Sequence, residues 1–312
     1  MNTTAPRLDL TSALLLLFLS VLWGASFLFA KIAVGAIPVF VALAARVMIG
    51  AASLGLYLIV TRHELPRELR IWRMFLFMGV FNNAIPFALL FWAQTEITAG
   101  LGAILNAMTP IFTLIVAHFL TRDEKITRDK LIGIGIGFCG VAVLVGPSLL
   151  LDPGRAALAK VACIVASVSY GFASVFGRRF AREGVSPLSA TFGQIVTSSL
   201  VIFPIALFFH PVATLAAAPV EVYLALLGLG IISTAFAYVL FYKILARAGA
   251  TNVSLVTLLV PVSATILGAL VLDETLTPMQ GLGMALISIG LLVMDGRIFD
   301  RIRQSIGHHT NN

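Results

Sequence analysis

Arg46 is the residue in this sequence whose setting most strongly indicates chemistry, because it is the one charge inside a long apolar stretch, 36–60. A charged side chain in apolar surroundings is costly unless it is paired, so such residues are functional candidates. All 14 aspartates and glutamates lie at the ends of the apolar stretches or between them. Arg46 could therefore attract an anionic ligand. Alternatively, it could tie its helix to Asn82 or to backbone carbonyls, and the sequence leaves both readings open.

Neutral polar and aromatic side chains recur near the middle of the other apolar stretches. At a rise of 1.5 Å per residue, these positions fall near the centre of helices that cross a bilayer. Aromatic faces with a few polar groups suit ligands that are partly apolar. The candidate substrate-binding residues are Trp23, Ser26, Arg46, Asn82, Asn83, Asn106, Thr109, Tyr170, Gln194, Thr234 and Tyr238.

Two prolines, Pro110 and Pro261, lie inside apolar stretches and predict helix kinks. A proline within a helix removes one donor and frees the carbonyl four residues earlier, here those of Asn106 and Thr257. Inside a membrane a freed carbonyl needs a partner, such as a side chain, water or a ligand. The prolines therefore predict matching kinks beside a central cavity. The alternative is that they only bend the helices for packing.

The elements that position these residues are apolar helices. The chain is 59% hydrophobic and 11% charged, with a mean hydropathy of +1.02. A spanning helix needs about 20 apolar residues, and no alternating pattern of membrane strands is present. Ten stretches meet the requirement for a helix: 10–30, 36–60, 71–92, 98–120, 130–145, 158–176, 185–209, 221–242, 250–272 and 278–294.

The second half of the sequence repeats landmarks of the first half. Phe91, Glu124, Gly133 and Gly140 recur 150 residues later, and Pro110 recurs after 151 residues as Pro261. Each copy holds five apolar stretches, so the second copy must enter the membrane from the opposite side. This pattern predicts an all-α membrane protein with ten transmembrane helices in two inverted five-helix repeats. The predicted parts are a first repeat at 10–146, a second at 157–295 and a cytoplasmic tail at 296–312.

The basic residues behind the net charge of +7 are distributed as membrane topology requires, not as a nucleic-acid-binding surface would be. Of 21 lysines and arginines, 17 fall on the side that holds both termini and three on the other side. The positive-inside rule therefore places both termini in the cytoplasm of a bacterial inner membrane. The segments between stretches, the longest at 147–157 and 210–219, are too short for a soluble domain. The expected partners are a small-molecule substrate and the lipid bilayer, not nucleic acid. The sequence leaves open whether the protein forms a homodimer.

Motifs for cofactors and metals give no site. Gly135-Ile-Gly-Phe-Cys-Gly140 fits a dinucleotide-binding pattern, but it lies inside a membrane stretch with no preceding strand. The histidines and cysteines have no metal-binding spacing, so no cofactor, metal or catalytic residue is expected. Glu124 and Glu274 end equivalent stretches and are interpreted as anchors for neighbouring cations or helix N-termini, with a gating role as the alternative.

Taken in order, these residues resemble the drug/metabolite transporter superfamily, in its ten-span branch with two EamA-type repeats. The resemblance rests on Trp23-Gly24, on Arg46, on the run from Ala103 to Pro110, and on Thr234 with Tyr238. It implies a central cavity lined by spans 1, 3, 4, 6, 8 and 9, with the fifth and tenth spans at the periphery. It also implies export of small metabolites by alternating access. Four-span relatives couple transport to protons through an intramembrane glutamate, which this sequence lacks.

The leading hypothesis is a secondary transporter, not an enzyme, that exports a small metabolite such as an amino acid or a related zwitterion or organic anion. One alternative is efflux of many amphipathic drugs. Others, from different classes, are an intramembrane lipid-modifying enzyme, for which no catalytic group is evident, and a membrane scaffold. Substrate identity, direction, coupling ion and oligomeric state are not determined by the sequence.

Overall fold

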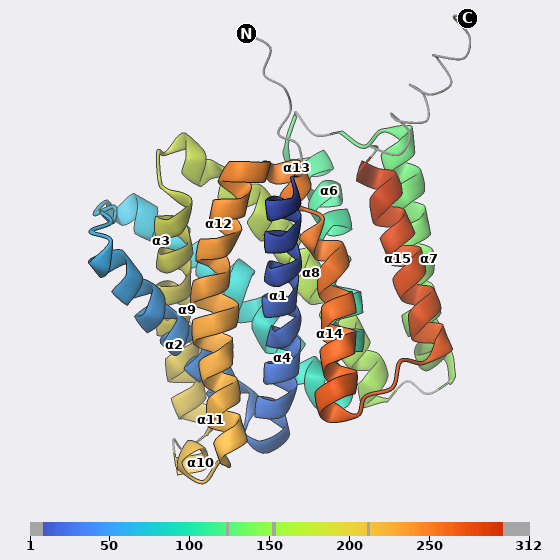
Figure 1. Cartoon of the computed structure of the whole chain (residues 1–312), viewed down its shortest axis with the longest axis horizontal. Coiled ribbons are helices and arrows are strands. Elements are labelled where there is room, and N and C mark those ends of the chain that lie inside the picture. Colours follow the sequence, from blue (N-terminus) through green and yellow to red (C-terminus); the bar gives the residue numbers. More distant parts are fainter. Residues whose placement is uncertain (1–8, 123–124, 152–153, 211–212, 296–312) are drawn as a thin grey trace, which may run out of the picture.

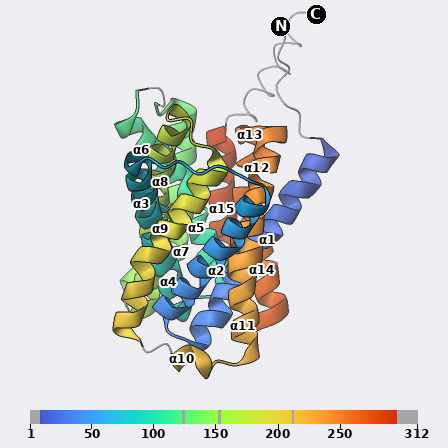
Figure 2. The same cartoon turned by 90° about the vertical axis from the view of Figure 1, so that its left-hand side faces the viewer.

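The protein is a bundle of membrane-length helices. The computed structural model describes residues 9–122, 125–151, 154–210 and 213–295, and these ranges contain helices and no strand. Nine of the described helical segments are long and apolar enough to cross a membrane, and a further apolar helix is shorter. Figures 1 and 2 show the segments standing side by side. The predicted all-α membrane fold is confirmed, with the shorter helix as the main part of the ninth span.

In both halves the third and fourth spans are interrupted, whereas the first, second and fifth are single helices. The first half consists of α1 (Leu10–Ala36), α2 (Val39–Val60), a third span of α3 (Leu69–Met78), η1 (Gly79–Ala84) and α4 (Ile85–Glu96), a fourth of α5 (Ala99–Asn106) and α6 (Thr109–Leu120), and α7 (Arg128–Leu151). The second half consists of α8 (Arg155–Arg182), α9 (Pro187–Phe209), the short α10 (Ala213–Ala216), an eighth span of α11 (Val220–Leu227), η2 (Gly228–Phe236) and α12 (Ala237–Ala248), a ninth of α13 (Ala250–Val253) and α14 (Val256–Leu272), and α15 (Pro278–Asp295).

Two sequence expectations need comment here. The predicted connection at 147–157 is wrong, because α7 continues to Leu151 and α8 begins at Arg155. The apolar residues after Pro147 extend the helix instead of leaving it. Glu124 and the predicted tail at 296–312 lie outside the described residues.

Close contacts at glycines show that the two halves pack by the same plan. Gly24 of α1 lies against the backbone of α14, where an added Cβ would be 2.7 Å from the Cβ of Ser263. Gly171 of α8 lies against α6, where an added Cβ would be 3.0 Å from the carbonyl carbon of Phe112. Ser263 lies 151 residues after Phe112, the spacing that also separates the two prolines. Span 1 thus packs on span 9 as span 6 packs on span 4, as an inverted repeat requires.

The third and eighth spans share an uncommon feature at equivalent places. The π-helices η1 and η2 begin at Gly79 and Gly228, and each replaces ordinary α-helix in the middle of its span. Gly79 lies against α9, with an added Cβ 2.5 Å from the Thr197 hydroxyl oxygen, and Gly230 lies against α2. Such π-helical turns are frequent at functional sites, since they turn neighbouring side chains to new directions.

The fifth and tenth spans, α7 and α15, pair at one edge of the bundle (right of Figure 1). An added Cβ on Gly133 would be 2.5 Å from the carbonyl oxygen of Gly290, and one on Gly290 would be 2.6 Å from that of Gly133. Small residues let helix backbones approach this closely within a membrane. The two helices therefore touch through their backbones, away from the centre.

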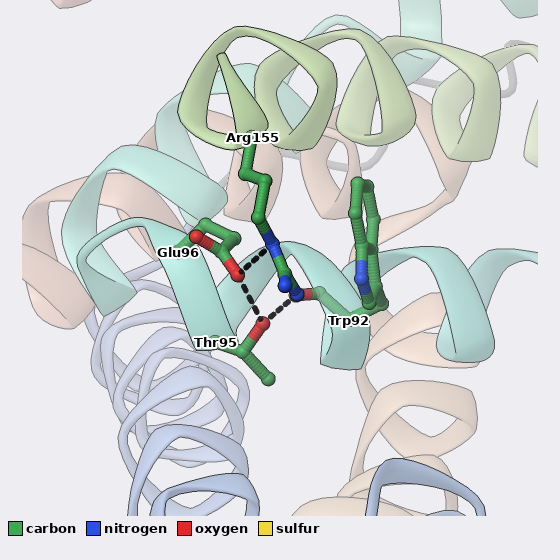
Figure 3. A network of polar contacts seen from close by, with 4 residues as sticks. All are labelled: Trp92, Thr95, Glu96 and Arg155. Carbon is green, nitrogen blue, oxygen red and sulfur yellow. Dashed lines mark hydrogen bonds and ion pairs between the residues drawn. The ribbon is translucent and has the colours of Figure 1, made fainter.

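An ion pair at each end of the bundle joins a first-half residue to a second-half residue. At the end where α1 begins, called here the Asp9 face, Arg247 of α12 donates to Asp9 at 2.6 Å. This arginine, with the Ser12 amide, holds the pKa of the Asp9 carboxyl well below its usual range. At the opposite end, the Glu96 face, Arg155 of α8 contacts Glu96 at 2.9 Å (Figure 3).

Candidate functional site

A cavity of about 1000 Å³ runs through the centre of the bundle. It is bordered by α1 and by α2, by the third and fourth spans, by α8 and α9, and by the eighth and ninth spans. Nine of the eleven candidate binding residues line it, together with both prolines. These nine are Trp23, Ser26, Arg46, Asn82, Asn106, Thr109, Tyr170, Gln194 and Tyr238.

Asn83 and Thr234, the other two candidates, are buried between helices and are not among the lining residues. The amide nitrogen of Asn83 donates to the Gln194 backbone carbonyl at 3.4 Å. The Thr234 hydroxyl donates within its own π-helix to the carbonyl of Leu229, at 2.7 Å. The residues just before them, Asn82 and Ser233, line the cavity instead. Asn83 and Thr234 thus pack between helices beside the cavity wall, while Asn82, also predicted, and Ser233 form part of that wall.

Arg46 is buried, with 9% of its surface exposed, and lies seven residues into α2 from its Glu96-face end. The guanidinium carbon is 3.9 Å from the ring centre of Phe87 and 5.6 Å from that of Phe91. Its Nε is buried and makes no hydrogen bond with the described residues. No aspartate or glutamate is among the described residues that line the cavity. Among the described residues no hydrogen bond joins Arg46 to Asn82, whose amide donates to Gln194 instead.

Asn82, Gln194 and Tyr238 form a neutral polar cluster in the same cavity. The Asn82 amide donates to the Gln194 side-chain oxygen at 2.9 Å, and Asn82 also interacts with the Tyr238 hydroxyl. The Tyr238 ring meets Trp23 edge-on at 6.3 Å between ring centres, and the Phe241 ring is tilted against Trp23 at 5.5 Å. This part of the wall combines hydrogen-bonding amides with broad aromatic surface.

The prolines have unequal effects on their helices. The fourth span breaks at 107–108, just before Pro110, and the freed carbonyl of Asn106 accepts from the Thr109 hydroxyl at 2.8 Å. The ninth span breaks at 254–255, well before Pro261, which lies inside the continuous α14. The fourth span is thus interrupted at its proline, whereas the matching kink at Pro261 stays a prediction. Asn106 presents a buried side-chain oxygen with no partner among the described residues.

The two ends of the cavity differ in exposure. Near the Glu96 face its lining is buried, with Gln94 and Phe91 each 1% exposed. At the same end Lys31 of α1 donates to the carbonyls of Gln94 and Ile97 at 2.7 and 2.9 Å, which ties α1 to the end of α4. Toward the Asp9 face the lining includes Ser254, which is exposed. The cavity therefore opens toward the face where α1 begins.

Glu274 belongs to the closed end and acts as a helix cap. Its carboxylate accepts from the backbone amides of Ala99 and Gly100, at 2.8 and 3.4 Å, where α5 begins. The positive end of a helix dipole favours a carboxylate at this place. This contact agrees with the interpretation of Glu274 as an anchor of a helix N-terminus.

The sequence reasoning missed several lining residues, of which Phe87 and Gln94 matter most. Gln94 donates to the Phe27 carbonyl at 2.9 Å and fills the closed end. Phe87, Phe91 and Gln94 follow one another at helical spacing, so they share one face of α4. Phe91 was singled out only as a repeat landmark, and extending its face by one turn in each direction would have found the others.

Comparison with known proteins agrees with this architecture. The profile described as the EamA-like transporter family matches the chain twice, at residues 10–146 and 158–294. A solved crystal structure of another protein superposes with a TM-score of 0.64 at 22% identity, covering 92% of this chain and 98% of that one. At that identity the likeness concerns the fold alone.

Several relatives are named as transporters or efflux pumps. A probable amino-acid metabolite efflux pump of Escherichia coli is 28% identical over 89% of this chain and 93% of its own length. An uncharacterized transporter of Bacillus subtilis, YoaV, is 25% identical over 88% of this chain and 93% of its own length. Two family repeats that together span most of the sequence surround one central cavity, and the chain therefore belongs to the EamA-like transporter family.

Proposed function

We propose that this transporter exports a small metabolite that carries a carboxylate, such as an amino acid or a related organic anion. One observation carries the proposal: a buried arginine, Arg46, lines the cavity without a hydrogen bond or an acidic neighbour among the described lining residues. A guanidinium matches a carboxylate through two parallel hydrogen bonds. A bound carboxylate would supply the counter-charge that Arg46 lacks.

The cavity is suited to a ligand that is part apolar and part polar. Its volume of about 1000 Å³ is at the upper end for small-molecule pockets. Trp23, Tyr170 and Tyr238 provide aromatic surface, while Asn82 and Gln194 provide hydrogen bonds. The naming of the Escherichia coli relative as an amino-acid metabolite efflux pump supports the same class of substrate.

Export by alternating access requires a second state that is open at the Glu96 face. The present arrangement opens toward the Asp9 face and is buried at the Glu96 face, where Lys31 ties α1 to the end of α4 and Glu274 caps α5. The two halves pack by one inverted plan. If each half took up the conformation that the other half has now, the cavity would close at the Asp9 face and open at the Glu96 face. This symmetry supports a mechanism in which the substrate site is exposed to each side in turn.

The experiment that tests the function is counterflow in proteoliposomes. Vesicles loaded with an unlabelled amino-acid mixture should accumulate a labelled neutral amino acid, and quaternary ammonium compounds should not compete. At about 6 Å and an effective dielectric near 20, repulsion by Arg46 amounts to roughly 3 kcal/mol against such a cation. Strong competition by lipophilic cations would favour the alternative, efflux of amphipathic drugs, which the aromatic lining could also serve. If neither amino acids nor lipophilic cations show counterflow, both carboxylate export and drug efflux are contradicted.

The orientation in the membrane is proposed from the charge asymmetry, with the Asp9 face toward the cytoplasm. A reporter enzyme active only outside the cytoplasm should give signal when it is fused within 210–219, between α9 and α11. The same reporter fused after Asn312 should be silent. The reverse pattern of signals would overturn the assignment.

A further inference from the structure

The repeat places equivalent aromatic residues in two regions of the cavity wall, called here its two poles. The polar groups beside the rings differ between the two poles. Phe87 and Tyr238 lie 151 residues apart, the spacing of the prolines, and Trp23 and Tyr170 lie 147 apart. The ring pairs they form are alike: Phe87 meets Tyr170 edge-on at 6.5 Å, and Tyr238 meets Trp23 edge-on at 6.3 Å. The cavity wall therefore carries the same aromatic pair twice.

The groups beside these pairs differ in charge. Arg46 lies over the Phe87 ring, whereas its counterpart Gln194, 148 residues later, belongs to the neutral cluster with Asn82 and Tyr238. Arg46 is seven residues from the Glu96-face end of α2, and Gln194 is seven residues from the Asp9-face end of α9. Arg46 is thus near the closed end, and the neutral cluster is nearer the open end, where Arg178 also lines the cavity but is already engaged in an interaction of its own.

Phe87 has a specific effect on what Arg46 can bind. A ring 3.9 Å from the guanidinium carbon stabilises the cation through its face, and this attraction uses none of the guanidinium donors. The Nε of Arg46 is buried, but the N–H groups on its two terminal nitrogens are not used by this contact and form a fork that fits a carboxylate. Phe87 is in turn held by Tyr170 and is 7% exposed, so its ring is fixed by packing.

We propose that Phe87 is a positioning residue that makes Arg46 a carboxylate receptor, and that Tyr238, Asn82 and Gln194 bind an uncharged polar group at the other end of the substrate. The cavity then binds monocarboxylates in one orientation, with the carboxylate toward the closed end. This inference rests on the proposed function, because it concerns the same cavity and the same arginine.

The test uses binding rather than transport. The purified full-length protein in detergent is titrated with hydrocinnamate, its amide and its para-hydroxy and para-carboxy derivatives, and dissociation constants are obtained from shifts in melting temperature. The unaltered protein should bind hydrocinnamate at least about tenfold more tightly than the amide, as expected for charge-assisted hydrogen bonds. It should bind the para-hydroxy derivative more tightly than the para-carboxy derivative, because the second pole is neutral.

The variants separate positioning from general packing. Phe87→Leu should reduce the preference for acid over amide by about tenfold, since an aliphatic side chain offers no cation–π attraction. Phe87→Tyr should keep the preference. Tyr238→Leu, at the equivalent place in the other half, should weaken the acid and the amide alike and leave their ratio unchanged.

The outcomes distinguish this inference from the proposed function. If Phe87→Leu keeps the full preference for the acid, Phe87 does not position Arg46, while the carboxylate site itself stands. If the para-carboxy derivative binds most tightly, the single orientation is wrong. If the unaltered protein does not distinguish hydrocinnamate from its amide, the carboxylate site fails and the positioning role fails with it.

Discussion

Replacing Arg46 with glutamine is expected to lower carboxylate counterflow about a hundredfold, because charge-assisted hydrogen bonds worth roughly 3 kcal/mol are lost. The fold should persist. Arg46 has no acidic neighbour among the described lining residues and its buried Nε makes no hydrogen bond, so glutamine removes an unpaired charge together with only the ring contacts to Phe87 and Phe91. A buried unpaired charge is unfavourable inside a membrane. The melting temperature of Arg46→Gln should therefore equal or exceed that of the unaltered protein.

The matched control is Arg62→Gln, the same substitution at an exposed residue just beyond α2. It changes the net charge by the same amount and should leave counterflow unchanged. Arg46→Lys adds a second comparison, because it keeps the charge but loses the planar fork, and it should fall between the two. If Arg46→Gln unfolds the protein, Arg46 has a structural role; if the variant folds and transports like the control, Arg46 does not bind the carboxylate.

Replacing Gly133 with valine is expected to destabilise the protein by about 3 kcal/mol, the upper part of the usual range for overpacking. An added Cβ at this position would be 2.5 Å from the Gly290 carbonyl and 2.8 Å from the Met294 amide, so two helix backbones would have to separate. Backbone atoms cannot turn away as a flexible side chain can. The loss should appear as a lower melting temperature and as aggregation on size-exclusion chromatography in detergent.

Gly135 provides the control on the same helix. It is exposed, and an added Cβ there meets nothing within 4 Å. Gly135→Val therefore carries the same helix-propensity change without the contact, and it should alter stability by less than about 1 kcal/mol. Equal losses at Gly133 and Gly135 would contradict the close backbone contact between α7 and α15.

The depth of the site residues could be predicted from sequence, but their direction around each helix could not. Depth follows from counting residues along an apolar stretch, and Arg46, Asn106 and Tyr238, which were chosen by this count, all line the cavity. Direction failed at Asn83 and Thr234, which lie in the π-helical turns. A π-helix adds residues to a turn and changes the face that each side chain occupies, and no local pattern signalled it.

Contacts between spans that are distant in the sequence could not be predicted either. The cap of α5 by Glu274 joins residues 175 apart, and the edge-on ring pairs join different halves. The repeat itself was visible in the spacing of prolines and glycines. Converting that repeat into pairs of touching helices requires the inverted packing, which only the structure supplies.

The ion pairs at the two faces favour one pairing of the halves over the others. Arg247 lies 151 residues after Glu96, and Arg155 lies 146 after Asp9, so the two pairs occupy equivalent places with their signs exchanged. Two copies of the first half, meeting in the same inverted way, would bring Asp9 against Glu96. Two copies of the second half would bring Arg155 against Arg247. Like charges placed opposite one another disfavour wrong partners. The exchange of signs thus favours pairing of unlike halves and opposes the self-association of either one.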